Sequence, residues 1–413
     1  MRLAEAFEQL VGTEFPVEFV AYDGSRAGDP DAGLRVEVRS QRALQYLVHA
    51  PGELGLARAY VAGDLEIEGD MYTTLSRLMA GSGQFQSMTG RQMLKLFREV
   101  GGIKLLRRVP PPDPEVRLHG RRHSKTRDQA AISHHYDVSN QFYEWVLGPS
   151  MTYTCAVYPE ADATLEQAQW TKYDLVARKL GLTEGMRLLD VGCGWGGMVR
   201  HAAKEYGVKV LGVTLSAKQA EWGQKAISEA GLSDLAEIRH CDYRDVAEGD
   251  FDAISSIGLT EHIGKANLPA YFGFLYDKLK PGARLLNHCI TRANSFDRTY
   301  YSKGFINRYV FPDGELVQPG HLVTLMSDTG FDVRHEENLR DHYAKTLAGW
   351  SANLEAHWDT AVAEVGAQTA RVWRLYMAGS RLGFERNWIQ LHQILGAKPG
   401  ADGAVSYPLR QTW

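Results

Sequence analysis

The chain has 413 residues, of which 44% are hydrophobic, an ordinary globular composition that allows about two or three domains. The formal net charge is only -4, the mean hydropathy is -0.31 and no run of about 18 apolar residues occurs, so a membrane-spanning helix is not expected. Four cysteines lie far apart without a C-x-x-C pair or a histidine cluster, which argues against a zinc site and for a reducing, cytoplasmic compartment.

The N-terminal region predicts a small α+β domain. MRLAEAFEQLVGTEF indicates an amphipathic helix, in which Glu5 and Glu8 interrupt any signal-peptide core. RVEVRSQRALQYLVHA predicts a strand followed by a helix, and LGLARAYVAGDLEIEGD predicts a helix followed by a short strand. The proline-rich VPPPDPE, residues 109–115, indicates a linker. We therefore expect a first domain over 1–108, a linker over 109–130 and a second domain over 131–413.

A basic segment runs from Arg91 to Arg127, where eleven lysines and arginines stand against three acidic residues, a net charge of +8. Within it, RQMLKLFREVGGIKLLRR alternates apolar and basic positions at helical spacing. Such a helix can lie on an anionic membrane surface, and the same pattern also suits a solvated helix packed on the next domain. No nucleic-acid partner is expected, because no aromatic interleaving or nucleic-acid module accompanies the basic residues.

From residue 186 the chain alternates strands with helices. RLLDVGCG, KVLGVTLS, AEIRHCDYRD and FDAISSIGL predict four strands, and a fifth follows in ARLLNHCI. The first intervening helix, GGMVRHAAKEYG, is expected to end at Gly207, a common C-cap. This order predicts an α/β fold with a parallel, doubly wound sheet that binds ligands at the carboxyl ends of its strands. The remainder, to residue 413, predicts a helical C-terminal extension rich in Trp and Tyr.

The turn LLDVGCGWGG fits G-x-G-x-x-G through Gly192, Gly194 and Gly197, a spacing often read as a dinucleotide-binding fingerprint. A nicotinamide site needs an acid near the end of the second strand, and LGVTLS has none there. The acids are instead Asp190, before the turn, and Asp242, after the third strand. This arrangement resembles the class I S-adenosylmethionine methyltransferases. The resemblance implies glycines that let the backbone approach the methionine and ribose, and an Asp242 that accepts from the adenine amino group.

Several stretches together are similar to the cyclopropane-fatty-acyl-phospholipid synthase family, which includes the mycolic-acid cyclopropane synthases. They cover roughly residues 120 to 350 in the family's order: HHYDVSNQFYEWVL, MTYTCAVY, VGCGWGG, VTLSAKQ, CDYRD, GLTEHIG, LLNHCI and RYVFPDGEL. The N-terminal AYDGS and PGELGLARAYVAGDLE look like the longer members, particularly an actinobacterial branch that makes 10-methylene fatty acyl chains in the tuberculostearic acid pathway.

The resemblance implies a class I methyltransferase fold and a reaction. S-adenosylmethionine would donate a methyl group to the cis double bond of an unsaturated fatty acyl chain in a membrane phospholipid. A bound bicarbonate ion would remove a proton from the resulting carbocation, which gives either a cyclopropane or a 10-methylene product. The resemblance also implies a homodimer, peripheral at the inner face of the membrane, whose N-terminal domain helps to present the lipid. A methylene product would call for a downstream reductase.

The resemblance also implies the residues of the site, and no metal among them. The bicarbonate would be held by Cys155, Glu261, His288, the backbone of Ile290, and Tyr343, which could also stabilise the cation. S-adenosylmethionine would be held by Tyr153, Thr154, Gly192, Gly194, Thr214, Leu215, Gln219, Asp242, Tyr243 and Ile257. Taken singly, the first group also reads as an ordinary buried cysteine, a helix-terminal acid and a core histidine, so only the joint occurrence carries the assignment.

Three positions depart from the family pattern. Thr260 replaces a phenylalanine often found before the Glu-His pair, and Asn287 and Cys289 around His288 are less usual. Thr260 would lie close to the acyl chain or cation, so these changes slightly favour the methylene branch. Two other readings remain open: a methyltransferase acting on oxygen or nitrogen of a small molecule, and a non-enzymatic lipid-binding protein that keeps the cofactor fold.

Overall fold

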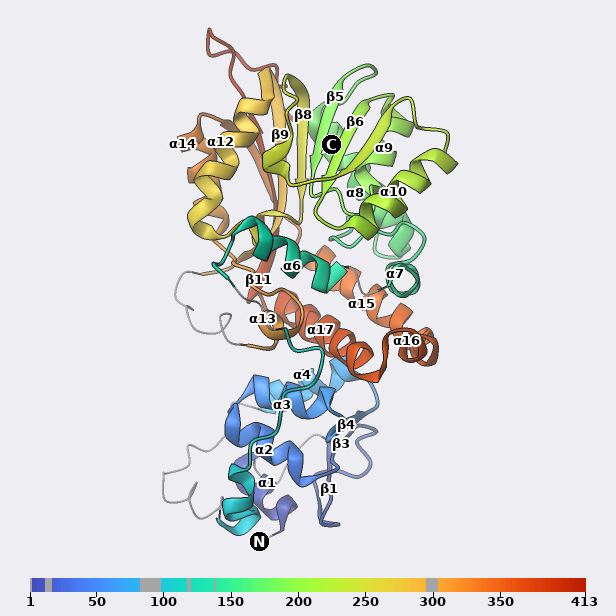
Figure 1. Ribbon diagram of the computed structural model, residues 1–413, viewed down its shortest axis with the longest axis vertical. Coiled ribbons are helices and arrows are strands. Elements are labelled where there is room, and N and C mark those ends of the chain that lie inside the picture. The colour runs from blue at the N-terminus through green and yellow to red at the C-terminus, as the bar shows by residue number, and fades with distance from the viewer. Residues whose placement is uncertain (1, 12–16, 82–97, 117–119, 137–138, 295–303) are drawn as a thin grey trace. The chain divides into compact units, whose positions relative to one another are not determined.

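The computed structural model describes residues 2–11, 17–81, 98–116, 120–136, 139–294 and 304–413. The chain forms two compact units (Figure 1). The first comprises Met1–Arg117, Lys303–Val310 and Trp358–Leu382, and the second comprises Leu118–Ser302, Phe311–His357 and Gly383–Trp413. Residues 303–310 and 358–382, which the sequence placed in the second domain, therefore pack in the first unit.

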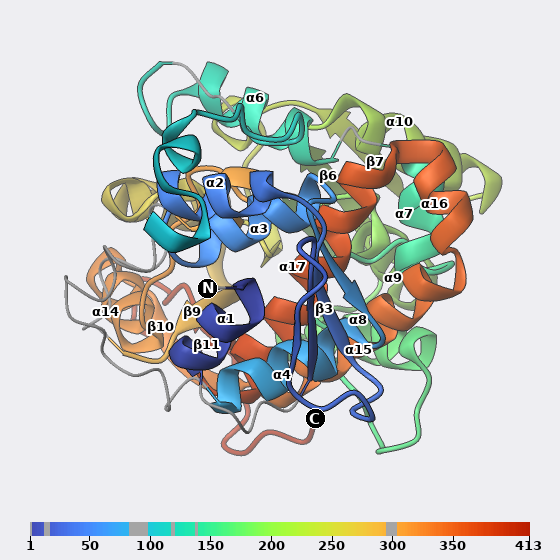
Figure 2. The ribbon, with the colours of Figure 1, turned by 90° about the horizontal axis from the view of Figure 1, so that it is seen from below.

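The first unit has the α+β character predicted for it. Its strands are β1 (Glu18–Ala21), β2 (Arg26–Ala27), β3 (Arg35–Val38) and β4 (Leu65–Glu68), in the sheet order β2-β1-β3-β4. Its helices are α1 (Leu3–Val11), α2 (Gln41–His49), α3 (Glu53–Val61), α4 (Met71–Gly81), the 3-10 helix η2 (Gly102–Leu106), α13 (Phe305–Tyr309), α16 (Trp358–Val365) and most of α17 (Ala367–Glu385). Helices α2 and α3 lie side by side (Figure 2). Gly55 permits this close approach, because a Cβ at that position would come within 2.2 Å of Ala50 O.

Hydrogen bonds and ion pairs link segments of the first unit that are far apart in the sequence. Glu115, at the end of the proline-rich stretch, is buried and accepts from Arg58 Nε at 2.7 Å and Arg58 Nη2 at 2.6 Å. Tyr309 Oη also donates to Glu115, at 3.0 Å. Arg371 of α17 pairs with Glu66 of β4. The buried carboxylate of Glu115 and the partly buried carboxylate of Glu66 are thus paired with residues far from them in sequence.

The second unit is built on one twisted sheet of seven strands in the order β10-β11-β9-β8-β5-β6-β7. Its strands are β5 (Arg187–Val191), β6 (Lys209–Thr214), β7 (Ala236–His240), β8 (Phe251–Ile257), β9 (Leu279–Arg292), β10 (Asp332–Asn338) and β11 (Ile389–Ala397). The five predicted strands are confirmed and run parallel. The C-terminal region contributes long helices as expected, and it also supplies β10 and β11, which pair antiparallel at the β9 edge.

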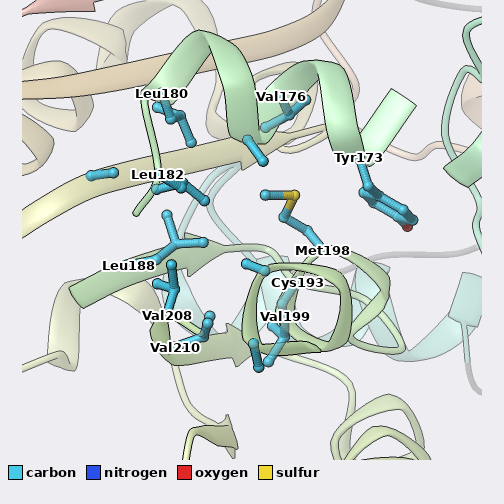
Figure 3. Packing of buried hydrophobic residues seen from close by; sticks show 14 of the residues in the cluster. Tyr173, Val176, Leu180, Leu182, Leu188, Cys193, Met198, Val199, Val208 and Val210 are labelled. Carbon is cyan, nitrogen blue, oxygen red and sulfur yellow. The ribbon is translucent and has the colours of Figure 1, made fainter. Parts of the chain in front are cut away.

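Helices cover both faces of this sheet (Figure 1). They are α8 (Leu165–Leu180), α9 (Gly197–Tyr206) and α10 (Ala217–Glu229) on one face, and α12 (Leu268–Lys278) and α14 (Pro319–Thr329) on the other. The unit also contains α6 (Lys125–Tyr136), α7 (Asn140–Leu147), α11 (Thr260–Ile263) and α15 (Arg340–Ala356), with 3-10 helices η3 (Tyr243–Asp245) and η4 (Lys265–Asn267). One core contains residues of α8, α9 and α10, and the other contains residues of α12 and α14. In Figure 3, Val176 and Leu180 of α8 pack over Leu188 of β5 and Met198 of α9.

Helix ends follow the sequence signals. Thr164 and Gln167 form a capping box at the start of α8, and Gly181 ends it in a left-handed conformation with φ 70°. Gly207 ends α9 with φ 64°, which confirms the predicted C-cap.

The basic segment is only partly described, since residues 82–97 and 117–119 lie outside the described ranges, so its amphipathic helix stays a prediction. Where it enters the second unit, three of its cations are paired: Arg122 and Arg127 with Asp313, and Lys125 with Asp245. Within the described ranges, no helix is both long and apolar enough to cross a membrane.

Candidate active site

A pocket lies at the carboxyl ends of β5, β6 and β8, where the doubly wound fold binds ligands. All ten residues predicted to hold the cofactor line it: Tyr153, Thr154, Gly192, Gly194, Thr214, Leu215, Gln219, Asp242, Tyr243 and Ile257. The structure therefore brings these ten residues together around one pocket, and their binding of the cofactor stays a prediction.

The glycine turn owes its shape to missing side chains. Gly192 and Gly194 have φ of 75° and 55°, in the left-handed region that glycine enters without steric cost. A Cβ at Gly197 would lie 2.0 Å from Tyr173 Oη, so the third glycine lets α9 approach α8 closely. Next to the turn, Asp190 accepts from Ser255 Oγ at 2.6 Å, and burial raises the pKa of Asp190 to about 6.

Polar side chains on the other side of the pocket are held in place by neighbours. Thr214 Oγ1 donates to Gln219 Oε1 at 2.8 Å. Asp242 accepts from Arg244 Nε at 2.7 Å and from Arg244 Nη2 at 2.5 Å. Burial alone would raise the pKa of Asp242, but the hydrogen bonds from Arg244 outweigh it and keep the pKa below its usual value. Asp242 is thus a rigid, ionised acceptor.

Glu261 stands just beyond the end of β8. The Gly258 amide makes the last bond from this strand to β9, donating to His288 O at 2.8 Å. Glu261 Oε1 then accepts from the Ile290 amide at 2.6 Å, so the side chain takes the place of a further strand residue. Burial raises the pKa of Glu261 to about 7. Its Oε2 is buried and has no hydrogen-bond partner among the described residues.

His288 lies on β9 directly opposite Ile257 of β8, which lines the pocket. It is fully buried, and its Nδ1 lies 3.2 Å from Gln393 Nε2. Burial, followed by the charges of Lys172 and Lys179, lowers the pKa of His288 well below its usual value. His288 Nε2, like Glu261 Oε2, is buried without a partner in the part of the chain that the structure describes.

The two remaining predicted residues are Cys155, which lies next to the start of α15, and Tyr343, which belongs to that helix. Cys155 is fully buried, and its Sγ lies 3.1 Å from Ala156 O and 3.8 Å from Leu339 O. Burial raises the pKa of the Cys155 thiol, so it stays protonated.

Tyr343 of α15 belongs to a row of four neighbouring aromatic rings, here called the aromatic wall: Tyr343, Trp350, Tyr153 and Phe311. The centre of the Tyr343 ring lies 6.1 Å from that of Trp350, and the centre of the Trp350 ring lies 5.3 Å from that of Tyr153. Tyr153 stacks in turn on Phe311, at 6.5 Å. The wall therefore connects a predicted anion-binding residue with the cofactor pocket.

The sequence prediction missed Lys172, a fully buried lysine on α8. Its Nζ donates to Thr154 Oγ1 at 3.0 Å and lies 3.5 Å from the centre of the Tyr173 ring. Burial lowers the pKa of Lys172 to about 7, although Cys155 and Asp190 oppose that shift. The signal was present in the sequence: Lys172 and Lys179 lie seven residues apart on the buried stripe of an amphipathic helix, where lysine is rare.

The three departures from the family pattern prove to be one hydrogen-bonded group. Thr260 Oγ1 donates to Asn287 Oδ1 at 2.6 Å, and Asn287 Nδ2 donates to Cys289 Sγ at 3.3 Å. Neighbouring strand residues point to opposite faces, so Asn287 and Cys289 lie on the face of β9 opposite to His288. That Thr260 lies close to the acyl chain stays a prediction.

Comparisons with known proteins agree with this geometry. The family model described as mycolic acid cyclopropane synthetase matches residues 123–394. A protein of Mycobacterium tuberculosis named probable fatty acid methyltransferase is 56% identical over 424 residues, covering 100% of this chain and 98% of its own. A Pseudomonas putida protein of the same name is 39% identical over 411 residues, covering 98% of each chain.

A solved structure shows the same fold over 65% of this chain. Mycolic acid cyclopropane synthase CmaA1, complexed with SAH and CTAB, aligns with a TM-score of 0.62 and 33% identity over 65% of this chain and 98% of that one. The expected class I fold is thereby confirmed. This chain is therefore an S-adenosylmethionine-dependent methyltransferase and belongs to the mycolic acid cyclopropane synthetase family.

Proposed function

We propose that this enzyme transfers the methyl carbon of S-adenosylmethionine to the cis double bond of an unsaturated fatty acyl chain in a membrane phospholipid. The names of its relatives refer to fatty acids and mycolic acids, both of which contain long acyl chains. The observation that carries the proposal is the pair of buried atoms Glu261 Oε2 and His288 Nε2, which have no hydrogen-bond partner among the described residues. Both residues adjoin pocket-lining ones, since Glu261 precedes His262 in the chain and His288 lies opposite Ile257 in the sheet. An alkene acceptor has no ionisable proton to lose before it attacks the methyl group. The two atoms suit such a reaction because they can hold an anion that takes up a proton after the transfer.

When bound, S-adenosylmethionine supplies an electrophilic methyl group, and a bicarbonate ion supplies the base that takes up a proton. The protein's part is to align, enclose and stabilise. The open backbone at Gly192 and Gly194 admits close approach, and the fixed carboxylate of Asp242 offers an acceptor to an amino group.

The free atoms of Glu261 and His288 fit a small oxyanion that carries a hydrogen. Such an anion can accept from an imidazole N–H and donate to a carboxyl oxygen, which would satisfy both orphaned atoms at once. The Ile290 amide already donates to Glu261, so its direct part in holding an anion stays a prediction. The protonated thiol of Cys155 can add a weak donor and does not compete as a nucleophile.

The aromatic wall of Tyr343, Trp350, Tyr153 and Phe311 suits a positive charge that develops on the acyl chain. If the proton leaves from the new methyl group, a cyclopropane closes. If it leaves from that group after a hydride shift, an exocyclic methylene remains, and saturating it would require a separate reductase.

We also propose that η2 of the first unit binds an anionic phospholipid surface. Ile103 and Leu106 are exposed to 84% and 54%, which is unusual for large apolar side chains. Lys104, Arg107 and Arg108 beside them are exposed as well. Apolar side chains flanked by cations are suited to insertion between lipid headgroups at an anionic membrane.

The test uses S-adenosylmethionine labelled in its methyl group and vesicles of phospholipid with oleoyl chains. We expect label in the acyl chains and none in matched vesicles with stearoyl chains, which lack the double bond. NMR of the product distinguishes upfield cyclopropane protons from vinylic methylene protons. Label in a small polar acceptor but not in lipid, from folded protein that binds the cofactor, would replace this proposal with an oxygen or nitrogen methyltransferase.

A further inference from the structure

His288 belongs to a row of side chains that crosses the antiparallel edge of the sheet. On β11, Gln393 lies directly opposite His288 of β9 and directly opposite Glu337 of β10. Residues that are directly opposite in a sheet point to the same face, so these three side chains are neighbours. Lys179 of α8 reaches the same row from the helix that covers this face.

Hydrogen bonds connect the row continuously. Lys179 Nζ forms an ion pair with the Glu337 carboxylate and donates to Gln393 Oε1 at 2.7 Å. Gln393 Nε2 lies 3.2 Å from His288 Nδ1. Lys179, Gln393 and His288 are fully buried, whereas the Glu337 side chain is 38% exposed. The chain of bonds therefore runs from a carboxylate at the surface to a buried imidazole.

The donor and acceptor types along this chain leave one arrangement. An ammonium group can only donate, so the amide atom of Gln393 that faces Lys179 must be the oxygen. The amide nitrogen then faces His288 and must donate, which makes Nδ1 the acceptor. A neutral imidazole carries one hydrogen, so that hydrogen is on Nε2.

The charges around Lys179 and His288 agree with this arrangement of donors and acceptors. Burial lowers the pKa of Lys179, but the carboxylates of Glu337 and Glu336 oppose that shift and favour the ammonium form. Burial and the nearby lysine charges favour the neutral form of His288. The imidazole is thus neutral, with a single hydrogen to place.

We propose that Glu337, Lys179 and Gln393 are positioning residues that fix His288 as the Nε2–H tautomer, so that it donates to the anion in the active site. The identity of the acceptor rests on the proposed function, whereas the tautomer does not. A donor that is set before the anion arrives needs no rearrangement during turnover, as with the outer hydrogen bonds that orient metal-bound histidines.

The direct test is nitrogen NMR of the full-length protein with 15N-labelled histidine, in which the His288 signals are identified by their loss in His288→Asn. We expect a pyridine-type shift for Nδ1 and a pyrrole-type shift for Nε2. In Gln393→Glu, which has nearly the same shape, a carboxylate faces the ring, so Nδ1 should become protonated. A wild-type ring with hydrogen on Nδ1, or an unprotonated Nδ1 in Gln393→Glu, overturns the proposal.

The functional test compares Lys179→Met and Gln393→Met in methyl transfer to oleoyl-phospholipid vesicles. Each should lower kcat by about tenfold. The Kd for S-adenosylmethionine should be unchanged, because Lys179 and Gln393 do not line the cofactor pocket. The matched control is Lys280→Met, which removes another lysine–carboxylate pair, with Asp252 at 2.6 Å, and should leave kcat unchanged. Unchanged kcat in Gln393→Met overturns the role in turnover.

The two readouts separate the two proposals. An Nε2–H ring in a protein that transfers no label to lipid would uphold the tautomer and defeat the lipid function. An Nδ1–H ring in a protein that methylates lipid would do the opposite.

Discussion

Glu261 uses its two carboxyl oxygens differently. One accepts the Ile290 amide and completes the sheet where β8 has ended, and the other is left without a partner in the described structure. The same residue thus closes a gap in the backbone hydrogen bonding and presents a polar atom to the site. The cost is a carboxyl group held in a buried place, where burial raises its pKa to about 7.

The raised pKa makes the stability contribution of Glu261 depend on pH. Between about 4.5 and 7 the folded protein binds a proton at Glu261 that the unfolded chain has lost, so the free energy of unfolding falls as pH rises through this range. Glu261→Gln removes this dependence. The variant should therefore gain stability over wild type as pH rises, by about 3 kcal/mol at pH 8 relative to pH 4. Urea unfolding at both pH values measures it, and a difference that does not change with pH contradicts the assignment.

The same variant tests the role of Glu261 in turnover. Glutamine can still accept from Ile290, but it can no longer exchange a proton at the second position, so the rate of methyl transfer should fall at least about tenfold. Wild-type rates from Glu261→Gln would remove this residue from the reaction. Binding of S-adenosylmethionine, measured calorimetrically, serves as the control for an intact pocket.

At the scale of elements, the approach of α9 to α8 shapes the glycine turn. Tyr173 of α8 occupies the space where a Gly197 side chain would be, and its Oη lies 2.9 Å from Thr152 Oγ1. The Lys172 ammonium rests on the same ring. The ring therefore cannot swing away without breaking both contacts.

Gly197→Ala should lower the free energy of unfolding by about 1–3 kcal/mol, the usual cost of overpacking a core. The matched control is Gly273→Ala in α12, where an added Cβ meets nothing within 4 Å and removes glycine's backbone freedom. That change should stabilise the protein by about 0.5–1 kcal/mol. Thermal or urea unfolding compares the two, and equal effects would show that the close approach of α8 and α9 is not required.

At the scale of the whole molecule, the proposed lipid contact belongs to the first unit. Arg122, Lys125 and Arg127 of the basic segment are already paired within the second unit, whereas Lys104, Arg107 and Arg108 are exposed beside Ile103 and Leu106. Ile103→Ser combined with Leu106→Ser should weaken binding to anionic vesicles at least about tenfold, since each buried aliphatic side chain contributes roughly 1.5–3 kcal/mol.

Vesicle sedimentation measures this binding, with Leu409→Ser as the control, because Leu409 is a fully exposed leucine of the second unit. Binding of the wild-type protein should also weaken as salt rises, since the surface cations are screened. Undiminished sedimentation of the double variant would place the membrane contact elsewhere.

Features that depend on neighbours along the chain could be predicted from the amino-acid sequence alone. Alternating strands and helices and the Gly192–Gly194 turn follow from periodicity and short motifs. The ten residues that line the pocket were implied by the family resemblance, and they lie together because loops at the carboxyl ends of parallel strands meet at one edge of the sheet. Lys172 and Lys179 were visible in principle, since each interrupts the buried stripe of α8.

Features that depend on pairing between distant segments could not be predicted from the sequence, because they arise only in the folded chain. Gln393 reaches His288 because β11, about a hundred residues later, pairs with β9, and no local pattern records that register. Thr260, Asn287 and Cys289 were three separate departures in the sequence and become one hydrogen-bonded group in the fold. Residues 303–310 and 358–382 belong to the first unit, where Tyr309 bonds to Glu115 and Arg371 pairs with Glu66, and no local sequence pattern records these contacts between distant segments.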